Sequence, residues 1–280
     1  MIIQNIPEIF ITEKNNELDL FVHDFKMIDD VFKSKVNLSL NMFSFLQKGK
    51  KQVHFADSSV AVNHKQSLLI KKGNCLWSEL LDNDDIYYCK LLFFSENKLK
   101  EFLKKHNYSL SNEDEAPSYF VIENDDYIHS YLNSLSTTID NTPTVFKENL
   151  LSIKFEELLL YLINKYGKVF ERYLQSLISK ERSAFKNVVE NNIYSNLRVD
   201  EIAFLCHMSL STFKRNFIKE YKVSPGKWLQ DKRLLKARAL LKDGKLKPSD
   251  IYLDFGYNNL SNFSAAFKNK FGKSPNLIDF

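Results

Sequence analysis

A repeated pattern in the last third of this 280-residue chain constrains its fold more than any other feature. Residues 199–225 and 248–275 can be laid over one another, at an offset of 49 residues that becomes 50 past a turn in the middle. The aligned residues are Ile202 with Ile251, Phe213 with Phe263, Phe217 with Phe267, Tyr221 with Phe271, and Ser224-Pro225 with Ser274-Pro275. Because the aromatic residues of each copy recur every four positions, they form one stripe on one face of a helix.

Each copy carries the local signals of a short helix, a tight turn and a longer second helix. Asp200 and Asp250 stand where negative charge favours the start of the first helix. Ser209 and Asn258 stand where the second helix needs an N-cap, and Gly256 permits a sharp turn in the second copy. This order predicts two helix-turn-helix motifs, in which the aromatic stripe packs inward and the opposite face of the second helix enters the major groove of DNA.

In the first motif, the face opposite the aromatic stripe carries hydroxyl and basic side chains. These are Ser211, Thr212, Lys214, Arg215 and Lys219. Arg215 is suited to a bidentate hydrogen bond with guanine O6 and N7, whereas serine and threonine contact either bases or phosphates. A helical hairpin with a solvated basic surface fits the same residues, but the duplication favours DNA binding.

The segment between the motifs predicts one long helix over residues 225–243, with an apolar side and Gly244 as its stop. Such a helix spans about 30 Å at about 1.5 Å per residue, close to the roughly 34 Å of one duplex turn. Residues 180–280 contain 19 Lys and Arg against 10 Asp and Glu, whereas residues 1–179 contain 20 against 25. The basic third is expected to bind a polyanion, although a solvated basic face gives the same balance.

These residues are similar to those of a known family. The arrangement IAFLCHMSLSTFKRNFIKEYKVSPGKWLQDKRLLKARALL, followed by DIYLDFGYNNLSNFSAAFKNKFGKSP, resembles the AraC/XylS family of bacterial transcription regulators. The resemblance implies that Ser211, Thr212 and Arg215 read bases, and that Asn262 and Ala265 stand at the equivalent positions of the second motif. It also implies double-stranded DNA and RNA polymerase as partners, and activation of transcription as the outcome.

Two departures from the family pattern concern the second motif. The family often has arginine at the position of Ala265, and it usually ends its final helix with a Tyr-Arg pair that this chain lacks. We therefore expect the second motif to contact mainly phosphates and to read DNA shape. Its expected DNA-binding residues are Ser261, Asn262, Ala265, Lys268 and Lys273, with Lys270 as a further basic contact.

The N-terminal part predicts a different class of structure. Short segments rich in branched and aromatic residues predict β-strands of a sandwich or small barrel, at residues 36–46, 52–56, 67–71 and 86–94. Helical spacing follows at residues 95–106 (with Ser95 as N-cap), 127–139, 144–165 and 170–178.

The expected fold class is α+β. The β-rich region at residues 1–122 (barrel or sandwich, with flanking helices) resembles the cupin-like regulatory domain common in the AraC/XylS family, and a helical dimerisation or linker region is expected at 123–179. An all-α domain at 180–280 is expected to hold the two helix-turn-helix motifs and the long helix that joins them.

The resemblance implies that the N-terminal domain controls the protein, and two hypotheses for the signal stay open. One is a small-molecule effector pocket lined by Phe43, Phe45, Trp77, Tyr87 and Phe93, although such rings also fill ordinary cores. The other is a protein effector, since the segment FLQKGKKQVHFADSSVAVNHKQSLLIKKGNCLW resembles a subgroup that responds to partner proteins. The helices at 144–165 and 170–178 are the candidate homodimer surface.

No residue pattern points to catalysis, a cofactor or a metal. The three cysteines form no disulfide or zinc pattern, and no two of the six histidines have H-x-H spacing. Cys206 and His207 are adjacent, but neighbours in sequence seldom face each other on a helix. An alternative function is a metal-dependent cupin-type oxygenase with a helical appendage, and a weaker one is a helical adaptor with a basic surface.

The chain is expected to lie in the cytoplasm and to have no membrane partner. No apolar run approaches the roughly 20 residues that span a bilayer. The first residues lack the basic start and apolar stretch of a signal peptide.

Overall fold

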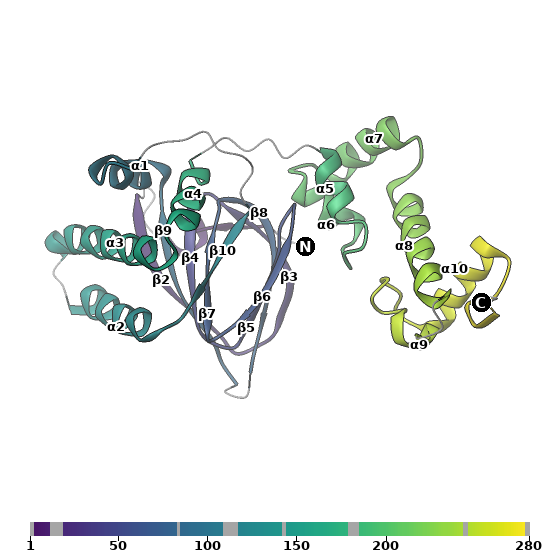
Figure 1. Ribbon diagram of the computed structural model, residues 1–280, viewed down its shortest axis with the longest axis horizontal. Coiled ribbons are helices and arrows are strands. Elements are labelled where there is room, and N and C mark those ends of the chain that lie inside the picture. The colour runs from purple at the N-terminus through teal and green to yellow at the C-terminus, as the bar shows by residue number, and fades with distance from the viewer. Residues whose placement is uncertain are drawn as a thin grey trace. The chain divides into compact units, whose positions relative to one another are not determined.

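The computed structural model describes residues 3–11, 19–82, 85–108, 117–141, 144–178, 185–242 and 246–277. The chain forms two compact units, Met1–Arg182 and Ser183–Phe280 (Figure 1). The expected domain boundary between residues 179 and 180 lies outside the described residues. Within those residues, no helix combines the length and the apolar character that crossing a membrane requires.

The N-terminal unit is built on two five-stranded sheets. Its strands are β1 (Ile3–Ile6), β2 (Leu20–Met27), β3 (Val31–Leu38), β4 (Asn41–Lys48), β5 (Lys50–His54), β6 (Ser59–Asn63), β7 (Gln66–Ile70), β8 (Gly73–Leu80), β9 (Tyr87–Phe94) and β10 (Tyr119–Glu123), with a short 3-10 helix η1 (Glu8–Phe10) after β1. One sheet has the order β1-β3-β8-β5-β6 and the other β10-β7-β4-β9-β2. The β domain is thus a sandwich of two sheets rather than a closed barrel.

The single strand expected at residues 36–46 is wrong. The segment belongs to two strands, β3 and β4, which are separated by a bend at Ser39 and Leu40. β3 pairs with β8 in one sheet, whereas β4 pairs with β7 and β9 in the other. Because both strands are partly or fully buried, apolar residues continue through the bend and hide it in the sequence pattern. The other three expected strands correspond to β5, β7 and β9.

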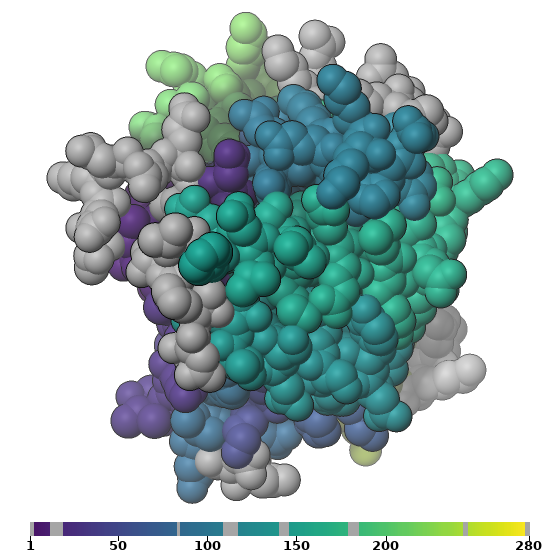
Figure 2. Space-filling model, turned by 90° about the vertical axis from the view of Figure 1, so that its left-hand side faces the viewer, coloured from purple at the N-terminus to yellow at the C-terminus, as the bar shows by residue number. Residues whose placement is uncertain are grey.

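Helices cover the outer face of the sheet that contains β9 (Figure 1). They are α1 (Glu96–Lys105), α2 (Asp126–Asn141), α3 (Thr144–Tyr166) and α4 (Lys168–Ser176), close to the four expected ranges. The Ser95 hydroxyl accepts a hydrogen bond from the Lys98 N–H at 3.0 Å, which confirms the expected N-cap of α1. Figure 2 shows the outer surface formed by these helices.

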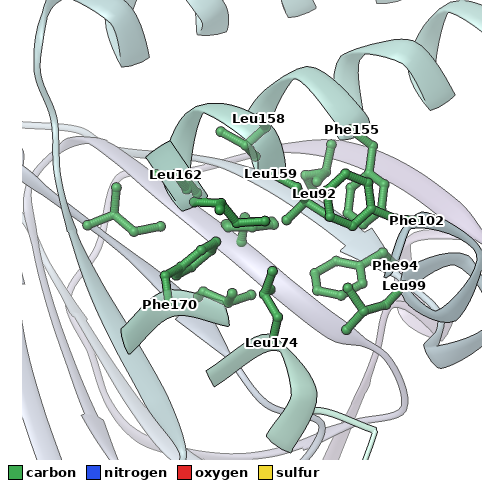
Figure 3. Close-up of a cluster of buried hydrophobic side chains, with 14 of the residues drawn as sticks. Leu92, Phe94, Leu99, Phe102, Phe155, Leu158, Leu159, Leu162, Phe170 and Leu174 are labelled. Carbon is green, nitrogen blue, oxygen red and sulfur yellow. The ribbon is translucent and has the colours of Figure 1, made fainter. Parts of the chain in front are cut away.

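Strand β9 is apolar on both sides because it has a core on each face. Leu92 and Phe94 belong to the core shared with the helices, and the Phe94 ring lies 5.0 Å from the Phe155 ring of α3 (Figure 3). Leu91 and Phe93 point the other way, into the core between the two sheets. A strand covered on both faces reads as a nearly continuous apolar run.

The described part of the C-terminal unit contains helices and no strand. Its elements are α5 (Phe185–Asn191), α6 (Val199–Leu205), α7 (Leu210–Tyr221), α8 (Pro225–Lys242), α9 (Pro248–Ile251), α10 (Leu260–Phe271) and the 3-10 helix η2 (Pro275–Leu277). The long connecting helix is α8, and its expected stop at Gly244 lies outside the described residues. Together with the N-terminal sandwich, these helices confirm the α+β class with two helix-turn-helix motifs.

Candidate nucleic-acid interface

The first helix-turn-helix motif consists of α6 and α7. The Ser209 hydroxyl accepts a hydrogen bond from the Thr212 N–H at 3.2 Å, so Ser209 is the N-cap of α7 as expected. Phe213 and Phe217 are fully buried, and both rings contact Phe185 of α5, at centroid distances of 5.5 and 6.3 Å. The aromatic stripe therefore seats α7 on the preceding helices, which fixes the face that α7 turns to solvent.

The turn between α6 and α7 contains the adjacent Cys206 and His207. His207 has a φ of 53°, a left-handed conformation in which histidine is more common than most non-glycine residues. Its equivalent in the second motif, 49 residues later, is Gly256 with a φ of 81°. Burial raises the pKa of the Cys206 thiol to about 12, so this thiol stays protonated at neutral pH. The pair therefore forms the turn of the motif, and a protonated thiol is a poor nucleophile at neutral pH.

The solvent face of α7 carries the residues expected to meet DNA. Ser211, Lys214, Arg215 and Lys219 are exposed, and Thr212 is half-buried. The Ser209 hydroxyl lies 3.0 Å from Ser211 Oγ and 2.9 Å from Thr212 Oγ1, so both hydroxyls belong to the N-cap network. Positions 211, 214, 215 and 219 share one helical face. The three cations on this face make no ion pair with any described residue.

The second motif consists of α9 and α10, and its N-cap differs from the expected one. The Asn259 side chain accepts a hydrogen bond from the Asn262 N–H at 2.8 Å, so Asn259 takes the place assigned to Asn258. The reason is the extra residue in the turn, which changes the repeat offset from 49 to 50 before the cap and pairs Ser209 with Asn259. The two helices also end alike, with Lys222 and Gly272 both left-handed.

The solvent face of α10 carries fewer charges than that of α7. Ser261, Asn262, Ala265 and Lys268 are exposed, as is Lys273 beyond the helix end. Lys270 is half-buried and its Nζ forms an ion pair with the Asp231 carboxylate of α8, which lowers the pKa of Asp231. Lys270 was expected to contact a phosphate, but its ammonium is held in this ion pair within the protein.

Helix α8 joins the two motifs and packs against both of them (Figure 1). Near its start, the Trp228 ring lies 5.6 Å from Phe217 and 4.9 Å from Tyr221 of the first motif. Farther along, three residues of α8 are buried with Phe263 and Phe267 of the second motif. These residues are Leu234, Ala237 and Leu241. The 18 residues of α8 span about 27 Å at about 1.5 Å per residue, so one rigid helix holds both recognition helices.

Comparisons with known proteins agree with this arrangement. Residues 194–277 match the family model described as a helix-turn-helix domain, and residues 41–173 match the one described as the ExsA N-terminal regulatory domain. The virulence regulon transcriptional activator VirF of Yersinia enterocolitica is 29% identical over 147 residues, which cover 50% of this chain and 54% of VirF. The transcriptional regulator ExsA of Pseudomonas aeruginosa is 28% identical over 127 residues, 45% of this chain and 46% of ExsA.

The chain belongs to the AraC/XylS family. The matches span about half the length of these curated relatives. A solved structure of ToxT from Vibrio cholerae is similar over 92% of this chain and 96% of its own, at 16% sequence identity and a TM-score of 0.41. The curated relatives are transcription regulators rather than enzymes, which argues against a cupin-type oxygenase.

In this family member, the five aromatic residues of the expected effector pocket do not line one cavity. Phe43 and Phe45 of β4 are buried against the helices, on the outer face of their sheet. Tyr87 and Phe93 of β9 lie on the opposite face of the same sheet, and Trp77 of β8 belongs to the other sheet. All three are buried in the core between the two sheets. The five separate because Phe43 and Phe45 lie on one side of β4, while Met42 and Leu46 lie on the other.

A small cavity of about 100 Å³ does lie between the sheets, and Trp77 is the one expected residue that lines it. Glu79 also lines this cavity, and its carboxylate pairs with the buried Lys51 ammonium at 3.1 Å. The Lys51 Nζ lies 3.9 Å from the centre of the Trp77 ring. The described residues contain no group of three or more His, Cys, Asp and Glu side chains arranged to hold a metal ion.

Proposed function

We propose that this AraC/XylS family member binds double-stranded DNA at specific sequences through α7 and α10 and regulates transcription. The observation that carries the proposal is the pair of matching helix-turn-helix motifs on one rigid helix, with a row of exposed cations on the first recognition helix. Helix α8 is about 27 Å long at about 1.5 Å per residue and joins the two motifs, and a connector of this length suits recognition helices in successive major grooves on one face of the duplex, which repeat about every 34 Å.

We propose that α7 sets the sequence preference. Arg215 stands in the middle of the exposed face, where its guanidinium can donate two hydrogen bonds to guanine O6 and N7. Ser211 and Thr212, near the start of the helix, would contact a base edge or a phosphate. Lys214 and Lys219 would pair with backbone phosphates on either side of the groove.

The second recognition helix is proposed to position the protein on DNA more than to read bases. Ala265 offers only a methyl group where Arg215 stands in the first motif. Ser261 and Asn262 remain for hydrogen bonds near the start of α10, and Lys268 and Lys273 for phosphates. Such contacts fix the position of the protein on the duplex but discriminate little between base sequences.

The proposed site of action is the cytoplasm, where a bacterial regulator meets its DNA. We propose activation as the outcome, with RNA polymerase as the partner on DNA, because both VirF and the resemblance of the motifs point to activators. The N-terminal unit would receive the signal, either a small molecule at the cavity beside Trp77 and Glu79 or a partner protein on its surface.

We also propose that the N-terminal unit forms a homodimer through α3. Phe146, Leu150, Ile153 and Leu160 are 60%, 39%, 60% and 40% exposed, and their spacing of four, three and seven places them along one side of the helix. The opposite side of α3 is already buried on the sheet. A second copy would cover this stripe with the same residues, since a two-fold dimer joins identical surfaces.

The dimer is tested by sedimentation of the full chain with the double substitution Phe146→Glu and Ile153→Glu. We expect the variant to sediment as a monomer at concentrations where the unchanged chain is a dimer, because four carboxylates would face one another across the interface. The control is Ile28→Glu with Phe32→Glu, which changes two residues of the same unit that are 73% and 63% exposed. A dimer that survives in the α3 variant would overturn this surface.

The DNA-binding proposal is tested by selection of the full chain against random-sequence duplexes, over a series of salt concentrations. We expect enrichment of a site with two blocks about one helical turn apart and a steep fall of affinity with salt, since phosphate contacts release counterions. If no sequence is enriched at any salt concentration, the motifs serve packing alone and the proposed function fails.

A further inference from the structure

One arginine of α8 is bonded to a part of the chain that precedes the first motif. Arg233 is half-buried, and its Nε donates a hydrogen bond to the carbonyl of Ile193 at 2.9 Å. Its Nη2 donates two more, to the carbonyls of Ser195 at 2.6 Å and Leu197 at 2.9 Å. All three carbonyls lie in the segment between α5 and α6, which has no helix or strand of its own. Arg233 therefore fastens the entry to the first motif onto the connecting helix.

The same guanidinium lies against the second motif. A Cβ atom added at Gly256, in the turn between α9 and α10, would lie 3.3 Å from Arg233 Nη1 and 3.1 Å from Asn196 Oδ1. This turn thus approaches both Arg233 and the entry segment of the first motif. Gly256 also has a φ of 81°, so the turn combines a left-handed backbone with a close approach that a side chain would obstruct. The two motifs approach each other here, and Arg233 lies between them.

Arginine suits this position because of its shape. A planar guanidinium holds several donors in a fixed fork, so three carbonyls bonded at once define its position and orientation. A lysine ammonium is a point charge on a flexible stem and cannot reproduce that fork. The apolar contacts of α8 hold each motif against this helix. The three hydrogen bonds of the Arg233 guanidinium also resist rotation of the entry segment and its sliding along α8.

We propose that Arg233 is a positioning residue that sets the distance and angle between the two recognition helices, and so sets the spacing of the two DNA blocks that this protein accepts. The inference rests on the proposed function, because it concerns the same DNA site. Arg233 lies on neither recognition face and determines the spacing between the blocks, whereas α7 determines which bases are preferred.

The test measures binding of the full chain to duplexes in which the two selected blocks are separated by the optimal distance, or by one or two base pairs more or fewer. For the unchanged chain we expect affinity to fall steeply away from the optimum. For Arg233→Lys, the ratio of optimal to off-spaced affinity should fall about tenfold, since a charged hydrogen bond contributes on that order. The preference for bases within each block should stay the same.

Two further variants make the result specific. Gly256→Ala places a methyl group against the fork and should flatten the spacing profile in the same way, and the double variant should show less than the sum of the two effects. Arg172→Lys, which changes an exposed arginine of α4 outside both motifs, should leave the profile unchanged. Thermal unfolding of each variant verifies that the chain is folded.

The possible outcomes distinguish a failure of the spacing role of Arg233 from a failure of the proposed DNA-binding function. If Arg233→Lys and Gly256→Ala weaken binding equally at every spacing, both residues only stabilise the fold and the inference fails. If the unchanged chain binds its selected site with no preference for spacing, the inference fails while the proposed function stands. If the unchanged chain selects no site, the proposed function fails first.

Discussion

The two recognition helices share their buried side and differ in their exposed side. Phe213 and Phe217 of α7 have equivalents in Phe263 and Phe267 of α10, and all four are buried. The N-cap and the left-handed C-cap also correspond in the two helices. On the exposed side, three cations of α7 become uncharged residues of α10. The changes are Lys214 to Ser264, Arg215 to Ala265 and Lys219 to Asn269.

The two copies of the repeat therefore share the buried residues that pack the motif, but not the exposed residues that would contact DNA. Packing of an aromatic stripe against the preceding helix requires particular residues at fixed spacing, so it constrains both copies alike. The exposed side has no such constraint within the protein, and it can differ according to what each helix meets. We infer that the first motif discriminates among sequences and the second holds the protein on the duplex.

The largest effect should come from Arg215→Ala. The loss of a bidentate pair with guanine is expected to weaken binding to the selected site by roughly ten- to a hundredfold, since such a pair contributes about 1–3 kcal/mol of discrimination. A repeated selection with the variant should show relaxed preference at one position of one block. The control is Arg172→Ala on α4, which removes the same charge from an exposed position outside both motifs and should leave the base preference unchanged. An unchanged preference in the Arg215 variant would contradict the assignment.

Ala265→Arg tests how closely α10 approaches the bases. If α10 lies in its groove, the long arginine side chain would clash with the base edges. We then expect the ratio of specific to non-specific affinity to fall about tenfold, or about 1.4 kcal/mol. Ala239→Arg on α8 adds the same charge at an exposed position away from both faces and corrects for general attraction to DNA. Equal ratios for the two variants would mean that α10 stands away from the base edges.

Smaller and more uniform effects should follow from removing the lysines. Lys214→Ala, Lys219→Ala and Lys268→Ala should each weaken binding to all sequences by a similar factor. Each should also reduce the slope of log affinity against log salt by about 0.9, the value for one phosphate contact. Lys104→Ala, exposed on α1, should leave the slope unchanged. A slope that is unaffected by Lys268→Ala would remove α10 from the phosphate backbone.

The sequence predicted the motifs well because their signals are local. Ser95 and Ser209 are N-caps where a serine precedes a periodic helix, and both caps are confirmed. The error at Asn258 arose because two asparagines are adjacent, and only the repeat offset distinguishes them. Arg233 gave no signal at all, since a basic residue in a basic helix reads as solvated.

Long-range features of the N-terminal unit were harder to predict. The bend between β3 and β4 is hidden because the strands belong to different sheets, and no local residue marks the crossing. The grouping of Phe43 with Trp77 failed because both are buried aromatic residues, and composition cannot show which side of a sheet each one faces. Such sidedness follows from strand register, which depends on residues far apart in the chain.

The most direct test of the account is guanine-methylation interference on the selected duplex with the full chain. Methylation at guanine N7 blocks an arginine in the major groove, so the account predicts strong interference in the block read by α7 and weak interference in the other, with the two blocks about one helical turn apart on one face. The strong interference should disappear for Arg215→Ala. Two results would contradict the different roles given to α7 and α10. One is equal interference in both blocks, and the other is interference in one block with none in the second.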